Sequence, residues 1–255
     1  MEGITLTLHL RSRRLRRDEN DRNVWRTVRH TRKVAAARTA IIVCDMWDAH
    51  WSRAGRERVD QMAPRMNQVV RAARARGVRV IHAPSDTLEF YRDTPARRRI
   101  IAVPPVTPPE PIELPDPPLP IDDSDWGSDT NHGDETPNDV VWTRQHSAIE
   151  IDQERDVISE NGGEIYSYLA RNGVETVVIM GVHTSACVLN RSFGIKQMVR
   201  WGVDIALARD LTDAMYNPAL PPYVSHADGT RLVVHYIEKF WCPTLSSRDL
   251  AGGET

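Results

Sequence analysis

A short apolar run, followed at once by a turn and a helical pattern, most restricts the fold of this chain. Residues 177–180 read Val-Val-Ile-Met, which is typical of a strand buried on both faces of a parallel sheet. Gly181 ends the run, and from Val188 onward apolar residues recur at helical spacing. Cys187 is therefore expected where a strand gives way to a helix, in surroundings that lower the pKa of a thiol. The alternative is a buried structural cysteine.

Further apolar runs at 40–44, 78–82, 139–144 and 203–208 predict more strands. Between them, helical patterns extend from Val59 to Ala73, from Glu164 to Asn172 and from Leu232 to Phe240, and Gly77 and Gly173 end the first two. Alternating strands and helices favour right-handed crossovers and a parallel sheet covered on both faces. The predicted fold is α/β, a three-layer αβα sandwich with a mostly parallel, doubly wound sheet.

We expect one large domain over residues 39–250, with an N-terminal strand and Arg-rich extension over residues 1–38. Residues 4–10 alternate strictly between apolar and polar side chains, so they predict a half-buried strand. The Arg-rich residues 11–38 are interpreted as a solvated extension, with a basic presequence or an anion-binding arm as alternatives. Residues 84–138, with nine prolines between Pro104 and Pro120, predict an irregular insertion packed over the domain as a lid or an oligomer contact.

Composition excludes several classes of protein. The net charge of −2 gives no reason to expect a nucleic-acid partner. The three widely spaced cysteines indicate a reducing compartment, and none has the spacing of a zinc site. No apolar run approaches the length of a membrane span, and the first residues contain no continuous apolar core of a signal peptide. We therefore expect a cytoplasmic protein without a membrane partner.

Three charged or nucleophilic residues follow predicted strands directly: Asp45, Arg144 and Cys187. The carboxyl ends of neighbouring parallel strands meet at one edge of a sheet, so these side chains are expected in one crevice. A carboxylate beside a thiol can take its proton, a cation can stabilise the thiolate, and backbone N–H groups can hold an oxyanion. Together these groups suit acyl transfer from an amide.

Three segments, AIIVCDMWDAHW, DVVWTRQHSAIEI and VVIMGVHTSACVLNRSFGIKQMV, resemble the isochorismatase-like cysteine hydrolases. The resemblance covers roughly residues 39–83 and 139–240, and implies a six-stranded parallel α/β fold with an Asp–Lys–Cys triad. We expect no cofactor. The family's Asp matches Asp45 and its Cys matches Cys187. A cis peptide would fall at Val182–His183, with the N–H groups of His183 and Cys187 as the oxyanion hole. The family's lysine position falls on Arg144 or Thr143, which is a departure from the family pattern.

Polar and aromatic residues near these strand ends are candidates for binding the substrate, each with ordinary packing or hydrogen bonding as the alternative. They are Trp47, His50, Trp51, His82, Gln145, His146 and Thr184. A metal near His50 or His82 is conceivable, but the spacing of the nicotinamidase metal motif is absent, so no metal is expected.

The leading hypothesis is a hydrolase that cleaves an amide or carbamoyl C–N bond of a small molecule through a thioester. The alternatives are a non-catalytic binding or scaffold protein with a degenerate triad, and a vinyl-ether hydrolase of the isochorismatase type, which does not need the cysteine. Family resemblance also implies a homo-oligomer. The sequence does not identify the substrate.

Overall fold

The computed structural model describes residues 3–130, 135–137 and 139–252, and contains one eight-stranded sheet with the strand order β2-β1-β8-β7-β6-β3-β4-β5. Neighbouring strands from β8 to β5 run parallel, whereas β1 is antiparallel to both β2 and β8. The strands are β1 (Thr5–Arg17), β2 (Asn23–Ala35), β3 (Thr39–Cys44), β4 (Arg79–Ala83), β5 (Val157–Ile158), β6 (Thr176–Val182), β7 (Ile205–Asp213) and β8 (Thr244–Leu245).

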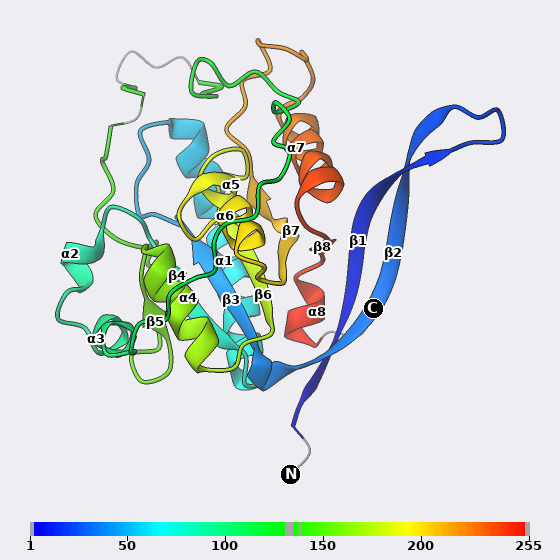
Figure 1. Cartoon of the computed structure of the whole chain (residues 1–255). Helices are drawn as coiled ribbons and strands as arrows, with labels where there is room; N and C mark the ends of the chain where they lie inside the picture. The colour runs from blue at the N-terminus through cyan, green and yellow to red at the C-terminus, as the bar shows by residue number, and fades with distance from the viewer. Residues whose placement is uncertain (1–2, 131–134, 138, 253–255) are drawn as a thin grey trace.

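Helices cover both faces of this sheet (Figure 1). One apolar cluster joins one face of the sheet to α4, α5, α6 and α7, and a second joins the other face to α1 and α8. The predicted three-layer αβα sandwich is therefore confirmed. The helices are a 3-10 turn at Ala36–Arg38, α1 (Arg53–Ala75), α2 (Leu88–Tyr91), α3 (Pro95–Ile101), α4 (Gly162–Arg171), α5 (Cys187–Asn190), α6 (Ile195–Arg200), α7 (His226–Phe240) and α8 (Arg248–Ala251).

The predicted strand at 139–144 is wrong. The edge position beside β4 belongs instead to the two-residue β5, whose side chains are fully buried. Val140 and Val141 are 59% and 47% exposed, and the only bridge nearby joins Gln145 to Trp47. Alternation in the sequence was compatible with a strand, but it did not specify a partner, and a strand exists only where its backbone finds one.

The N-terminal residues form a hairpin, and its Arg-rich part beyond Leu10 is solvated, since no residue of that part of β1 or of β2 is buried. Residues 4–10 were expected to be a strand, and β1 begins at Thr5 with Leu6, Leu8 and Leu10 buried. The strand then continues through the arginines to Arg17, and β2 pairs with it over its whole length. Figure 1 shows the far end of this hairpin extending beyond the body of the domain.

The insertion at 84–138 is only partly irregular, since it begins with the short helices α2 and α3, which the sequence analysis did not predict. Its Pro-rich part then crosses the helical layer of α4, α6 and α7 (Figure 1). The N–H of Val106 donates to Ser167 Oγ at 2.9 Å, and the N–H of Ile112 donates to the carbonyl of Arg200 at 2.9 Å. Residues 131–134 and 138 of the expected insertion lie outside the described residues, as do residues 1 and 2 of the expected extension.

The helix expected after Cys187 is divided into two. The short helix α5 ends at Asn190, and α6 begins at Ile195 after a turn that contains Gly194. The small strand β8 and the helix α8 were not predicted, because their two and four residues are too short for a periodic pattern. None of the helices in the described part of the chain is long and apolar enough to cross a membrane.

Candidate active site

Asp45 lies immediately after β3 and is completely buried. Its Oδ1 accepts a hydrogen bond from the backbone N–H of Ser85 at 2.7 Å, and its Oδ2 lies 3.2 Å from Nε of Arg191. Burial raises the pKa of this carboxyl, while the guanidinium of Arg191 and the hydrogen bonds from Ser85 oppose the rise. Asp45 is therefore a buried acid that is fixed in position by a backbone donor and a cation.

Cys187 begins α5, after the turn that follows β6. The peptide bond Val182–His183 is cis, as the resemblance implied. Gly181 lets β6 approach β3 closely at this point. It has a φ of +117°, and a Cβ there would lie 2.0 Å from the carbonyl oxygen of Cys44. This close approach brings the Cys187 turn against the end of β3, next to Asp45.

The thiol of Cys187 interacts directly with the carboxylate of Asp45, and the backbone N–H of His183 points at the sulfur. Burial raises the pKa of this thiol well above its ordinary value, and the negative charge of Asp45 raises it further, against the positive charge of Arg191. The expectation that helix geometry lowers the thiol pKa is therefore wrong. The helix that follows has only four residues, and desolvation with a neighbouring carboxylate outweighs its dipole.

The cation at this site is Arg191, which the sequence analysis did not select. Its Nε faces Asp45, its Nη2 lies 2.9 Å from Oδ2 of Asp86, and its side chain is 33% exposed. Burial lowers the pKa of this guanidinium, but the carboxylate of Asp45 and the neighbouring Cys187 raise it by more, so it stays charged. The signal in the sequence was its spacing, since a residue four positions after Cys187 returns to the same side after one helical turn.

Arg144, the cation that the sequence analysis selected, does not contact Asp45 or Cys187. Its Nε lies 3.6 Å from Oδ2 of Asp48, its guanidinium carbon lies 5.4 Å from the ring centroid of Phe90, and its side chain is half exposed. Thr143, the other candidate for the lysine position, donates its backbone N–H and its hydroxyl to Asp48. The expected strand at 139–144 does not form, so neither residue is carried to the sheet edge where Asp45 and Cys187 meet.

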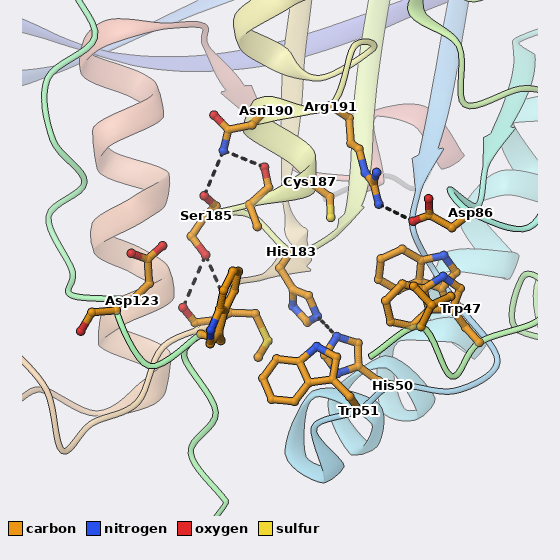
Figure 2. Close-up of a pocket in the computed structure, with 16 residues that line it drawn as sticks. Trp47, His50, Trp51, Asp86, Asp123, His183, Ser185, Cys187, Asn190 and Arg191 are labelled. Carbon is orange, nitrogen blue, oxygen red and sulfur yellow. Dashed lines mark hydrogen bonds and ion pairs between the residues drawn. The ribbon is translucent and has the colours of Figure 1, made fainter. Parts of the chain in front are cut away.

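A pocket of about 520 Å³ opens beside the Cys187 sulfur, and Figure 2 shows its walls. Trp47 stacks on Trp142 with ring centroids 4.0 Å apart, and both indole N–H groups donate to the carbonyl of Ser85. Trp51 and Trp126 complete a mainly aromatic lining. The predicted pocket residues Trp47, His50 and Trp51 therefore do line the pocket.

His50 and His183 form a hydrogen-bonded pair in this wall, with 3.1 Å between their Nε2 atoms (Figure 2). The backbone N–H of Ser52 donates to Nδ1 of His50, so the proton of neutral His50 is on Nε2 and His183 accepts it. Burial lowers the pKa of His50 to about 4 and that of His183 to about 3. The pair is therefore uncharged near neutral pH. His183 was expected to act through its backbone N–H, and its side chain also belongs to the pocket.

Four predicted substrate-binding residues do not line the pocket. His82 is buried between Gln145 and Asp156, at 2.8 Å and 3.1 Å, in a network that also contains Arg74. His146 pairs with Asp60 on α1, and Thr184 is buried against Thr212. These side chains hold loops and strands in place behind the site. They were selected because they are close in sequence to the ends of predicted strands, which does not specify the direction of their side chains.

The Pro-rich insertion supplies a wall of the pocket that sequence reasoning did not locate. Asp123, Ser124 and Trp126 line the pocket, and Trp126 is 53% exposed. Figure 2 shows Asp123 on the side of the pocket away from Arg191. Asn190 also lines the pocket and donates to the carbonyl of Ala186. Among the residues that the structure describes, no group of three or more His, Cys, Asp or Glu side chains could hold a metal ion.

Comparison with known proteins gives a family and a fold. The model of the Isochorismatase domain family matches residues 39–219. A cysteine hydrolase from Pseudomonas syringae pv. phaseolicola 1448A is 18% identical, with a TM-score of 0.51 over 86% of this chain and 95% of that one. A putative isochorismatase from Burkholderia xenovorans LB400 is 15% identical, with a TM-score of 0.49 over 84% and 86% of the two chains. No curated protein sequence matches this chain.

Proposed function

Because the chain belongs to the isochorismatase domain family and holds a thiol against a buried carboxylate, we propose that it is a cysteine hydrolase. It cleaves an amide or carbamoyl C–N bond of a small molecule and passes through a thioester on Cys187. The observation that carries the proposal is the meeting of Cys187, Asp45 and Arg191 beside an open pocket. A buried acid, a nucleophile and a fixed cation are the parts that acyl transfer needs.

In the first step, the sulfur of Cys187 attacks the substrate carbonyl while its proton passes to Asp45. Because the pKa of the resting thiol is raised, attack and proton transfer occur together, without a preformed thiolate. The carbonyl oxygen becomes an oxyanion, for which the backbone N–H groups of His183 and Cys187 are the proposed donors. The N–H of His183 already points at the sulfur, which supports this assignment.

In the second step, the C–N bond breaks and the leaving nitrogen takes the proton from Asp45, which leaves a thioester and a carboxylate. Water then attacks the thioester while Asp45 accepts a proton from that water. The C–S bond breaks, the carboxylic acid leaves, and Asp45 returns the proton to the sulfur, which restores the thiol and the carboxylate. The raised pKa of Asp45 suits both roles, because such a carboxyl accepts a proton more readily than an ordinary aspartate does.

Arg191 acts by its charge alone. A guanidinium does not lose its proton near neutral pH, so Arg191 cannot replace a lysine that exchanges protons. Its contacts with Asp45 and Asp86 hold it beside the thiol, where its charge stabilises the negative charge that moves from Asp45 to sulfur to oxygen. Asp45 is therefore the only proton carrier in this proposal.

The pocket walls favour a flat, uncharged or weakly polar substrate. The stacked Trp47 and Trp142, the neighbouring Trp51 and the neutral His50–His183 pair offer aromatic faces. The lining also contains two carboxylates, Asp86, which pairs with Arg191, and Asp123. A volume of about 520 Å³ is within the range of small-molecule sites. A small aromatic amide or a carbamoyl compound fits these surroundings.

The test is a panel of small aromatic amides and carbamoyl compounds, with ammonia or amine release measured beside mass spectrometry of the acid-quenched protein. We expect turnover with at least one compound, and a covalent acyl adduct on the peptide that contains Cys187. Cys187→Ala should abolish both signals, whereas Cys242→Ala, which removes a buried thiol outside the pocket, should retain them.

The alternative hypotheses give different results. A non-catalytic binding protein would bind compounds from the panel without releasing a product. A vinyl-ether hydrolase would keep its activity in Cys187→Ala, since that chemistry does not need the thiol. Either result would overturn the proposal.

A further inference from the structure

A second hollow lies between the N-terminal hairpin and the body of the domain, and its lining is strongly basic. This hairpin groove has a volume of about 340 Å³ and is lined by residues His9, Leu10, Arg11, Arg29, His30, Thr31 and Arg209. Arg11 and Arg29 are direct partners in the register of β1 and β2, so two positively charged residues occupy opposed positions. Like charges in opposed positions destabilise a strand pair unless something compensates for them.

Acidic side chains are present around the hairpin groove, but each of them already forms ion pairs with residues other than Arg29 and Arg209. Glu238 on α7 is fully enclosed and accepts from Nε of Arg11 at 2.6 Å and from Nε of Arg13 at 3.1 Å. Asp249 accepts from the backbone N–H and the ring of His9. These pairs neutralise Arg11 and stabilise the base of the hairpin. They leave Arg29 and Arg209 without an ion pair among the described residues, although the negative charges of Glu238 and Asp249 still act on Arg209.

Asp210 is also occupied, although it is the chain neighbour of Arg209. It pairs with Arg65 at 2.6 Å and accepts from the backbone N–H and hydroxyl of Ser247. The carboxylate closest to Arg209 along the chain is therefore turned toward α1 and α8.

Arg209 carries the strongest sign of a missing partner. Its Nη1 is buried and has no hydrogen-bond acceptor among the described residues. Burial lowers the pKa of its guanidinium, and the positive charge of Arg11 lowers it further. Arg29, on the other wall, likewise makes no ion pair within the described part of the chain. A buried cationic donor without an acceptor is unfavourable, and an anion that enters the groove would remove this cost.

We propose that the hairpin groove binds a small oxyanion, the phosphate or carboxylate group of a small molecule, through the guanidinium groups of Arg29 and Arg209. A guanidinium presents two parallel N–H donors that match two oxygens of such a group. None of the groove residues lines the pocket beside Cys187, so this site does not depend on the proposed hydrolase activity.

The experiment uses the full chain and two probes, inorganic phosphate and citrate, each titrated at constant ionic strength with sodium chloride as the balance. Thermal unfolding and isothermal calorimetry report binding. We expect a saturable rise of the melting temperature with phosphate, and a loss of affinity of tenfold or more in Arg209→Gln and in Arg29→Gln. Arg29 is exposed, so its variant should fold normally and keeps the test valid if Arg209→Gln does not fold.

Arg16→Gln is the matched control, because Arg16 is an exposed arginine on the same strand as Arg11 and outside the groove. We expect it to bind phosphate as the unaltered protein does. Saturation by phosphate alone assigns a phosphate ligand, and saturation by citrate as well assigns oxyanions in general. The proposal is overturned if neither anion saturates, or if Arg16→Gln weakens binding as much as the groove variants.

Discussion

Replacing Asp45 by Asn should separate the reactivity of the thiol from catalysis. The carboxylate of Asp45 raises the pKa of the Cys187 thiol, so removing the negative charge of Asp45 should lower that pKa. The positive charge of Arg191, which lowers the thiol pKa, would then act without an opposing carboxylate. Two unit charges ~4 Å apart interact by about 4 kcal/mol at an effective dielectric constant of about 20. That energy corresponds to a shift of about 3 pKa units.

The assay is the rate of alkylation of Cys187 by iodoacetamide across a pH series, read by mass spectrometry of the modified peptide. In the unaltered protein the midpoint should lie above the ordinary range of a cysteine. In Asp45→Asn it should move down by about 2 to 3 units, so that the variant reacts faster at neutral pH. Hydrolysis of any amide substrate should nevertheless fall by about 10³-fold or more, because the proton carrier is lost.

Asp48→Asn is the control, since it removes a carboxylate that pairs with Arg144 outside the pocket. It should change neither the midpoint nor the rate at neutral pH. An unchanged or higher midpoint in Asp45→Asn would refute the electrostatic argument. A lower midpoint with full hydrolytic activity would refute the assignment of Asp45 as proton carrier.

Three further predictions follow from the same geometry. Arg191→Gln should lower hydrolysis by about 10²-fold or more through loss of the charge beside Asp45, whereas Arg191→Lys should retain part of it, measured as kcat/KM. Gly181→Ala should lower the free energy of unfolding in a denaturant titration by more than Gly173→Ala; both glycines have positive φ, but only the Cβ at 181 would meet a backbone oxygen. Below pH 6.5 the contribution of His50 to the free energy of unfolding should decrease by about 3 kcal/mol as the pH falls to about 4, because the unfolded chain binds a proton that buried His50 does not bind. Buried His183 adds to this decrease, and His50→Gln should reduce the slope in a denaturant titration across pH.

Much of the fold could be predicted because each central strand carries its own signal. The run at 40–44 and the run at 177–180 are apolar at every position, and such runs are buried wherever they pair. The segment 139–144 carries a weaker signal, and the structure leaves Val140 and Val141 exposed. Whether such a segment becomes a strand depends on a partner elsewhere in the chain, and local sequence does not contain that information.

The candidate site could be predicted in part for a similar reason. Asp45 and Cys187 follow buried parallel strands, and the ends of such strands meet at one edge of a sheet. The pocket wall formed by Asp123, Ser124 and Trp126 comes from an irregular segment whose path is set by contacts such as that of Asp116 with Lys196 and Tyr236. No periodic pattern encodes such a path.

The family model matches residues 39–219. Self-association of the chain stays a prediction.

The position of Arg191 has a consequence for how this site keeps its geometry. A cation on a strand of its own would be positioned by the pairing of the sheet, and the chain has no strand at 139–144 to provide one. Arg191 instead directly follows the short helix that Cys187 begins, and its N–H donates to the carbonyl of Cys187 at 3.0 Å. Nucleophile and cation therefore move as one unit. Because the two nitrogens of its guanidinium contact Asp45 and Asp86 on neighbouring strand ends, the same side chain fixes that unit against the sheet, which a lysine with a single ammonium group would do less rigidly.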